Sequence, residues 1–158
     1  MIAKRDNIWL EKILYEIWEE YFNDVPRKNL VVIKFGKNSI RQLGCIRIAN
    51  EKSRGIKNKL KELNYQDEKS ISVITITKLF QKTIVPEYVV KATIAHELCH
   101  YTHGFNSPLK QIYNHPHKGG IVSKEMKKRS LDKLNRQSKK WMRMHWREVI
   151  KLSKLSIN

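Results

Sequence analysis

The chain has 158 residues, and 32 Lys and Arg against 15 Asp and Glu give it a formal charge of +17. This length suits one domain with a real core, and 41% hydrophobic residues exclude the disordered and collagen-like classes. The presence of only two cysteines excludes a disulfide framework and a four-cysteine zinc ribbon and is typical of a reducing cytosol. No apolar run approaches the length of a membrane span. We therefore expect a single cytoplasmic domain over residues 1–158 without membrane contact.

The amino-terminal part of the chain predicts an amphipathic helix. Apolar residues recur every three or four positions over residues 10–21, which is the spacing of one helix face. Asp6 or Asn7 is placed to cap this helix at its start, and Pro26 follows its end. We expect the apolar face of this helix to pack into the core.

The next part of the chain predicts three strands. Residues 30–35 and 39–48 are rich in β-branched side chains and suggest two strands arranged like a hairpin. Residues 50–69 are lysine-rich and predict a short helix or a loop. Residues 70–80 carry apolar side chains at both odd and even positions, which is typical of a strand covered on both faces.

The carboxyl-terminal half predicts three further helices. Residues 87–103 follow a proline and contain no helix breaker before Gly104, which has the position of a helix-ending glycine. Residues 106–120 form a loop rich in Pro, His and Gly, after which Ser123 is placed to cap a short helix. A longer helix is expected over residues 136–155.

Histidines cluster at and after the predicted helix 87–103. Five of the six lie within 22 consecutive residues, and His96-Glu97-Leu98-Cys99-His100 forms the pattern H-E-x-x-H. Because four residues advance a helix by about 400°, both imidazoles leave the same face and can bind one zinc ion. Glu97 is rotated by about 100° from His96, which suits a general base that takes a proton from water.

A catalytic zinc site takes a third protein ligand from elsewhere in the chain. His103 shares the stripe of His96 and His100 but lies a turn further on, so we interpret it as a neighbour of the site or a surface residue. The remaining candidates are His115 and His117 in the loop and Glu125 beyond it. Residue spacing alone leaves these three open.

The motif and its surroundings resemble the SprT-like family of small zincin metallopeptidases. The resemblance covers residues 1–130 and rests on His-Glu-Leu-Cys-His after a strand, followed by a loop, a His and a glycine. It implies an α+β, zincin-like domain in which a small sheet packs beside the H-E-x-x-H helix, with helices at both ends of the chain. It also implies one Zn²⁺ per chain, held by His96, His100 and, because Gly119 and Gly120 follow it, His117 as preferred third ligand.

By the same resemblance, Glu97 is the catalytic carboxylate of a zinc-dependent peptidase that acts on protein or peptide substrates. An extended peptide is expected to pair with the edge of a strand, with residues 70–80 or a neighbouring strand as the template. The usual His-Gly step is here His117-Lys118-Gly119, and the zinc ribbon common in the family is absent. The DNA-binding mode of the family therefore does not carry over directly.

The last third of the chain is strongly basic. Residues 108–158 hold 14 Lys and Arg and three acidic residues, so this segment carries +11 of the total charge. We expect a basic helical extension at about residues 131–158, whose cations at three- and four-residue steps are Lys140, Arg143, Arg147, Lys151 and Lys154. A solvated helix face explains such a stripe in most proteins. Here the basic excess extends over the whole domain, with a pI near 10.0, which is typical of contacts to a nucleic-acid backbone. This basic surface suggests that the substrates of the expected peptidase are proteins associated with DNA. The alternative to the peptidase hypothesis is a non-catalytic, zinc-containing DNA-binding protein.

Overall fold

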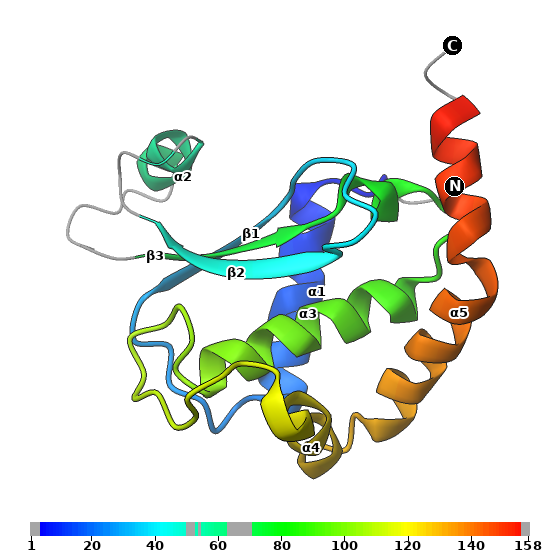
Figure 1. The fold of residues 1–158 in the computed structure, drawn as a ribbon. Helices are drawn as coiled ribbons and strands as arrows, with labels where there is room; N and C mark the ends of the chain where they lie inside the picture. The colour runs from blue at the N-terminus through cyan, green and yellow to red at the C-terminus, as the bar shows by residue number, and fades with distance from the viewer. Residues whose placement is uncertain (1–3, 50–52, 54, 63–70, 156–158) are drawn as a thin grey trace.

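The computed structural model describes residues 4–49, 53, 55–62 and 71–155, and these form an α+β fold with a small mixed sheet (Figure 1). The strands are β1 (Leu30–Phe35), β2 (Gly44–Ala49) and β3 (Ile71–Ile76). The α-helices are α1 (Asn7–Tyr21), α2 (Ile56–Glu62), α3 (Glu87–Thr102), α4 (Ile121–Lys128) and α5 (Asp132–Leu155), with short 3₁₀ turns η1 (Lys78–Gln81) and η2 (Lys118–Gly120).

The sheet has the order β1-β3-β2, with β1 parallel and β2 antiparallel to β3. The expected hairpin between the first two strands is therefore wrong, and β3 lies between them. Residues 36–43 connect β1 to β2 and are longer than a tight hairpin loop. Hydrogen bonds from the Thr77 amide to the Leu43 carbonyl (2.8 Å) and from the Lys78 amide to the Lys37 carbonyl (3.0 Å) hold this connection against the end of β3.

The central place of β3 follows from its composition. Ile71, Val73, Ile74 and Ile76 are all buried, which a strand achieves when both its faces are covered. Ile74 and Ile76 pack into the main core, whereas Ile71 and Val73 pack with Ile56 of α2 in a second, smaller cluster. Figure 1 accordingly shows α2 on one side of the sheet and α3 on the other. The strand predicted at 70–80 ends at Ile76 and continues as η1.

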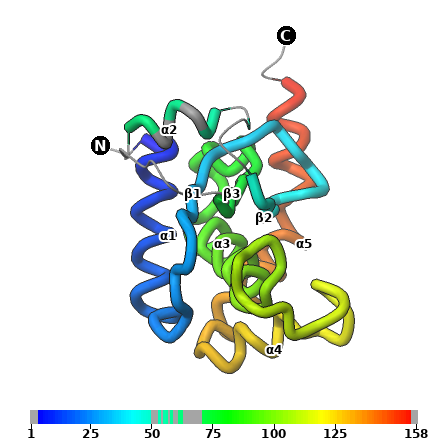
Figure 2. Tube along the Cα trace, turned by 90° about the vertical axis from the view of Figure 1, so that its left-hand side faces the viewer, coloured from blue at the N-terminus to red at the C-terminus, as the bar shows by residue number. Residues whose placement is uncertain are grey.

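Helix α3 lies at the centre of the molecule. Figure 2 shows it between α1 and α5, and Figure 1 shows the sheet above it. Most of its residues are buried, which explains why it carries few charges along its length. It begins at Glu87 as predicted, and Gly104 follows its end with φ +81°. A Cβ on Gly104 would lie 2.5 Å from the Gln111 backbone, so glycine lets the following loop fold back closely.

The remaining helices are present as predicted from the sequence, but some of their boundaries differ from the prediction. Asp6 caps α1 through a 3.0 Å hydrogen bond from the Trp9 amide. Gly120, with φ +65°, precedes α4, so Ser123 lies inside this helix and does not cap it as expected. Helix α5 begins at Asp132, four residues before the predicted start at 136. Of the segment 50–69, α2 is described, whereas residues 50–52, 54 and 63–69 lie outside the described residues.

Candidate metal centre

His96 and His100 leave the same face of α3, as the four-residue spacing predicts. Their ring centroids are 4.8 Å apart, and the rings meet edge to face. His100 is buried and His96 is partly exposed. The helix is fixed by the core on its other faces, so the backbone of α3 sets the position of both imidazoles.

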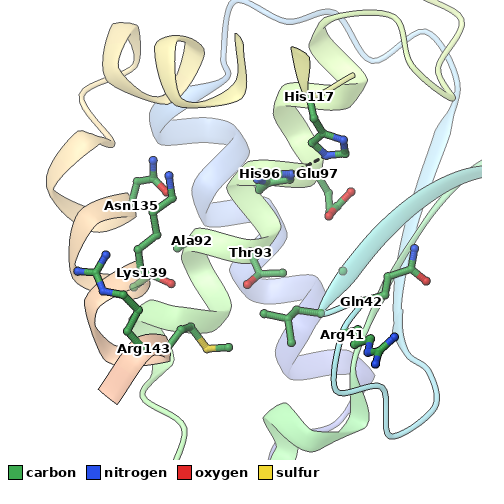
Figure 3. Close-up of a pocket in the computed structure, with 14 residues that line it drawn as sticks. Arg41, Gln42, Ala92, Thr93, His96, Glu97, His117, Asn135, Lys139 and Arg143 are labelled. Atoms are coloured by element: carbon green, nitrogen blue, oxygen red, sulfur yellow. Dashed lines mark hydrogen bonds between the residues drawn. The ribbon is translucent and has the colours of Figure 1, made fainter. Parts of the chain in front are cut away.

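The loop after α3 brings His117 to these two histidines. The Nε2 atom of His117 lies 3.0 Å from Nε2 of His100 and 3.4 Å from Nε2 of His96. His117 is exposed and immediately precedes η2, so it approaches the helix face from the solvent side. Figure 3 shows the His117 ring directed towards His96.

These three side chains could hold a metal ion, because one ligand atom from each lies within 4.8 Å of the others. Nitrogens at about 2.0–2.1 Å from a tetrahedral zinc ion are about 3.3 Å apart, which is close to the 3.0 and 3.4 Å observed here. Burial lowers the pKa of His96 to about 4 and that of His100 to about 3, with further lowering by the neighbouring histidines. Both rings are therefore neutral at pH 7, which is the form that binds a metal.

The other two candidates for a third ligand lie elsewhere. His115 is exposed and lines a separate cavity with Tyr113, Asn114 and Lys118. Glu125 on α4 accepts a 2.8 Å hydrogen bond from Nε of Arg129, and its other carboxylate oxygen lies 3.3 Å from Nε2 of His103. The structure therefore brings His117, and neither His115 nor Glu125, to the two helix histidines.

His103 is wholly buried, so its interpretation as a surface residue is wrong. Its ring packs edge to face on Tyr113, with centroids 4.9 Å apart, and faces Glu125. Glu125 and Asp24 in turn bind the guanidinium of Arg129 at 2.8 and 2.6 Å. This chain of contacts ties the end of α3 to α4 and to the end of α1, and so supports the loop that carries His117.

Glu97 lines the same small cavity as the three histidines, where α3 passes the start of β2, and Figure 3 shows it next to His96 and His117. Only 4% of the residue is exposed, and this burial raises the pKa of its carboxyl to about 8. Gly44 allows the close approach, because a Cβ at that position would lie 2.8 Å from Oε1 of Glu97 and 2.8 Å from Cγ2 of Thr93. This steric role of Gly44 does not follow from the sequence, since nothing local in the sequence places it beside Glu97.

Two cavities meet at His96, Glu97 and His117. The larger, about 690 Å³, runs along α3 between α5 and the connection 36–43 and is called here the α5 cleft. Its other lining residues include Arg41, Gln42, Leu43, Ala92, Thr93, Asn135, Lys139, Met142 and Arg143. The smaller, about 200 Å³, lies on the other side of the histidines, where Cys45 and Ile46 of β2 face Phe105 and Pro116. A chain that occupied both cavities would cross the three histidines.

The five predicted nucleic-acid contacts lie on α5, and all are exposed. Arg143 differs from the other four, Lys140, Arg147, Lys151 and Lys154, because it also lines the α5 cleft. Two further cations of this cleft, Arg41 and Lys139, were not singled out from the sequence. Arg41 comes from the distant connection 36–43, so only the folded chain places it near α5.

Comparisons with protein-family models, with curated proteins and with solved structures find no match for this chain. Within the described residues, no helix has both the length and the apolar character needed to cross a membrane. Cys45 and Cys99 are not bonded to each other and both are free thiols.

Proposed function

We propose that this protein is a zinc-dependent metallopeptidase of the SprT-like kind, with a zincin-like fold. The observation that carries the proposal is the convergence of three histidine Nε2 atoms beside a buried glutamate whose pKa is raised. Three converging imidazoles suit Zn²⁺, and the exposure of His117 leaves one side of the site open to solvent. A structural zinc site has four protein ligands and no need of a buried glutamate next to them.

In this proposal, His96, His100 and His117 would hold zinc, which would supply Lewis-acid chemistry by acidifying water and polarising a substrate carbonyl. Glu97 takes the proton of the attacking water and delivers it to the leaving amine. Burial raises the pKa of this carboxyl, which makes it a stronger base towards the proton of the water. The missing side chain of Gly44 leaves room for the Glu97 carboxylate beside the start of β2.

The two cavities supply room for substrate on both sides of the scissile bond, which supports the cleavage of internal peptide bonds. The β3 strand cannot serve as the template for an extended substrate, because β1 and β2 pair with its two edges. Strand β2 replaces it in this proposal. Its outer edge pairs with no described strand, and Cys45 and Ile46 line the smaller cavity next to Glu97.

The first test combines metal content with hydrolysis. We expect one zinc per chain in the wild-type protein, by elemental analysis, and cleavage of a broad peptide mixture, by mass spectrometry. Glu97→Gln retains zinc and loses hydrolysis by at least about 100-fold, because a general base is removed while the ligands remain. His117→Ala loses both zinc and hydrolysis.

His115→Ala is the matched control, because it removes a histidine two positions away in the same loop. It retains zinc and hydrolysis. Absence of zinc from the wild-type protein after reconstitution, or full hydrolysis by Glu97→Gln, contradicts the proposal. Loss of zinc in His115→Ala but not in His117→Ala contradicts the ligand assignment alone.

The exposed cations of α5 favour one addition to this proposal. They form a positive surface beside the site, which suits a peptidase that acts in the cytoplasm on proteins associated with DNA. The same surface supports the second candidate function, a non-catalytic zinc-containing DNA-binding protein. This second function is favoured if the protein cleaves no peptide but binds single-stranded DNA with an affinity that falls as salt is added. The affinity must also be unchanged by Glu97→Gln.

A further inference from the structure

The α5 cleft joins the metal centre to a strongly basic rim. Arg143 and Lys139 stand on the α5 side, and Arg41 stands on the opposite side, on the connection 36–43 (Figure 3). Lys139 is close enough for its charge to contribute to the lowered pKa of His96. Glu97 is the one acidic residue among the described residues that line this cleft, and it is buried.

The cations of the rim are available to a ligand. Arg41 and Arg143 are exposed, and within the described part of the chain neither takes part in an ion pair. Lys139 donates a 3.2 Å hydrogen bond to the hydroxyl of Ser123 and has no carboxylate partner there. Exposed side chains of this length change rotamer within nanoseconds, so both arginines can turn over the cleft.

The floor between these cations is largely apolar. Leu43, Ala92 and Met142 line it, together with the methyl-bearing Thr93. An apolar floor under a cationic rim complements a peptide that has carboxylate side chains, because the aliphatic part of Glu or Asp packs below and the carboxylate reaches the rim. A cavity of about 690 Å³ is within the usual range of ligand sites.

Nucleic acid fits this particular cleft less well. Surfaces that bind single strands stack bases on aromatic side chains, and the described residues that line the α5 cleft include no Trp, Tyr or Phe. The remaining α5 cations, such as Arg147 and Lys151, lie outside the cleft. The cleft and the exposed stripe are therefore two positive surfaces that have Arg143 in common.

We propose that the α5 cleft selects substrates with acidic side chains next to the scissile bond, with Arg41 and Arg143 as the residues that determine this preference. The inference rests on the proposed peptidase function for its biological meaning. The cleft binds the acidic segment and so places the adjoining peptide bond over His96, His117 and Glu97. An unusually basic protein thereby prefers acidic peptide segments at its site.

A binding experiment tests the preference separately from hydrolysis. Two fluorescein-labelled decapeptides, identical except for two central Glu residues in one and two Gln residues in the other, are titrated with the full-length Glu97→Gln protein in zinc-containing buffer of 0.15 M ionic strength. Fluorescence anisotropy is the readout. We expect the Glu peptide to bind roughly tenfold more tightly, the effect of two or three exposed ion pairs.

The double variant Arg41→Gln/Arg143→Gln, made in the same background, reduces this preference to about twofold or less. The matched control is Arg147→Gln/Lys151→Gln, which removes the same charge from α5 outside the cleft and keeps the preference. Equal affinity for the two peptides overturns the inference. An equal loss of preference in both double variants also overturns it, because overall charge then explains the binding.

Two further measurements complete the design. The first measures binding of a twelve-nucleotide oligo-dT. If it binds more tightly than the Glu peptide and loses affinity in Arg41→Gln/Arg143→Gln, the cleft is a nucleic-acid site and the inference is overturned. Incubation of both peptides with the wild-type protein, followed by mass spectrometry, tests the peptidase. If the Glu peptide binds more tightly but neither peptide is cleaved, the acidic preference of the cleft is supported and the proposed peptidase function is contradicted. If both peptides bind equally and both are cleaved, the peptidase function is supported and the acidic preference is contradicted.

Discussion

Substitution of Gly44 by alanine tests whether the start of β2 positions the Glu97 carboxylate, for which we propose a catalytic role. The new Cβ would lie 2.8 Å from Oε1 of Glu97, 2.8 Å from Cγ2 of Thr93 and 3.3 Å from Cγ of Glu97. Ordinary contacts between such atoms are about 3.5 Å or longer, so Glu97 and Thr93 must each move by more than half an ångström. Because α3 is buried, the carboxylate is the part that moves most easily.

The expected cost follows from these contacts. Overpacking destabilises by about 1–3 kcal/mol, and alanine returns about 0.4–1 kcal/mol by restricting the unfolded chain. We expect a net loss of about 1–2 kcal/mol, which lowers the Tm by roughly 2–8 °C in a chain of this size. Displacement of a catalytic group by about 1 Å lowers activity up to about 100-fold, so kcat/KM falls much further than stability alone predicts.

Zinc content, thermal melting and peptide hydrolysis are measured on the same preparation. We expect Gly44→Ala to retain the proposed zinc ion, because the three atoms nearest to the new methyl group belong to Glu97 and Thr93 and not to a histidine. Gly36→Ala is the matched control, since its Cβ would lie 2.5 Å from Cγ2 of Thr75, away from Glu97. It is destabilised but keeps its activity per folded molecule. Activity of Gly44→Ala within twofold of wild type would refute the reasoning.

Two further predictions concern stability. Burial raises the pKa of Glu97 to about 8 from an ordinary value of 4.5, so the stability associated with the protonated carboxyl is complete below pH 4.5 and is lost as the pH rises to about 8. In metal-free protein, the wild type therefore loses stability between pH 5 and 8, whereas Glu97→Gln does not. We expect the difference in the free energy of unfolding between the variant and the wild type to increase by up to a few kcal/mol over this range. Urea denaturation curves that stay equally far apart from pH 5 to 8 contradict this prediction. Arg129→Met leaves Glu125, whose side chain is only 11% exposed, beside His103 without its cation, and we expect a loss of about 3 kcal/mol in urea denaturation. Arg136→Met removes an exposed pair with Asp132 and changes stability by less than about 0.5 kcal/mol, so equal effects of the two substitutions would contradict the prediction.

The features that the sequence alone determined are those set by short-range periodicity. Helix α3 begins at the predicted residue, and the four-residue spacing of His96 and His100 places both rings on one face, because 3.6 residues complete a turn. The capping of α1 by Asp6 and the exposure of the α5 cations follow from local pattern in the same way. Each of these features depends on residues within one helix.

Only the tertiary structure decided which distant residues meet. Three candidates for the third ligand had similar chemistry and similar distance in sequence, and the return path of the loop brought His117 to the helix face and Glu125 to His103 and Arg129. The order β1-β3-β2 could not be predicted from strand patterns, because apolar alternation does not specify which strands pair. Gly44 reaches Glu97, and Arg41 reaches the α5 cleft, through contacts between segments about 50 to 100 residues apart. Packing of the whole core decides such contacts, since no local preference encodes them.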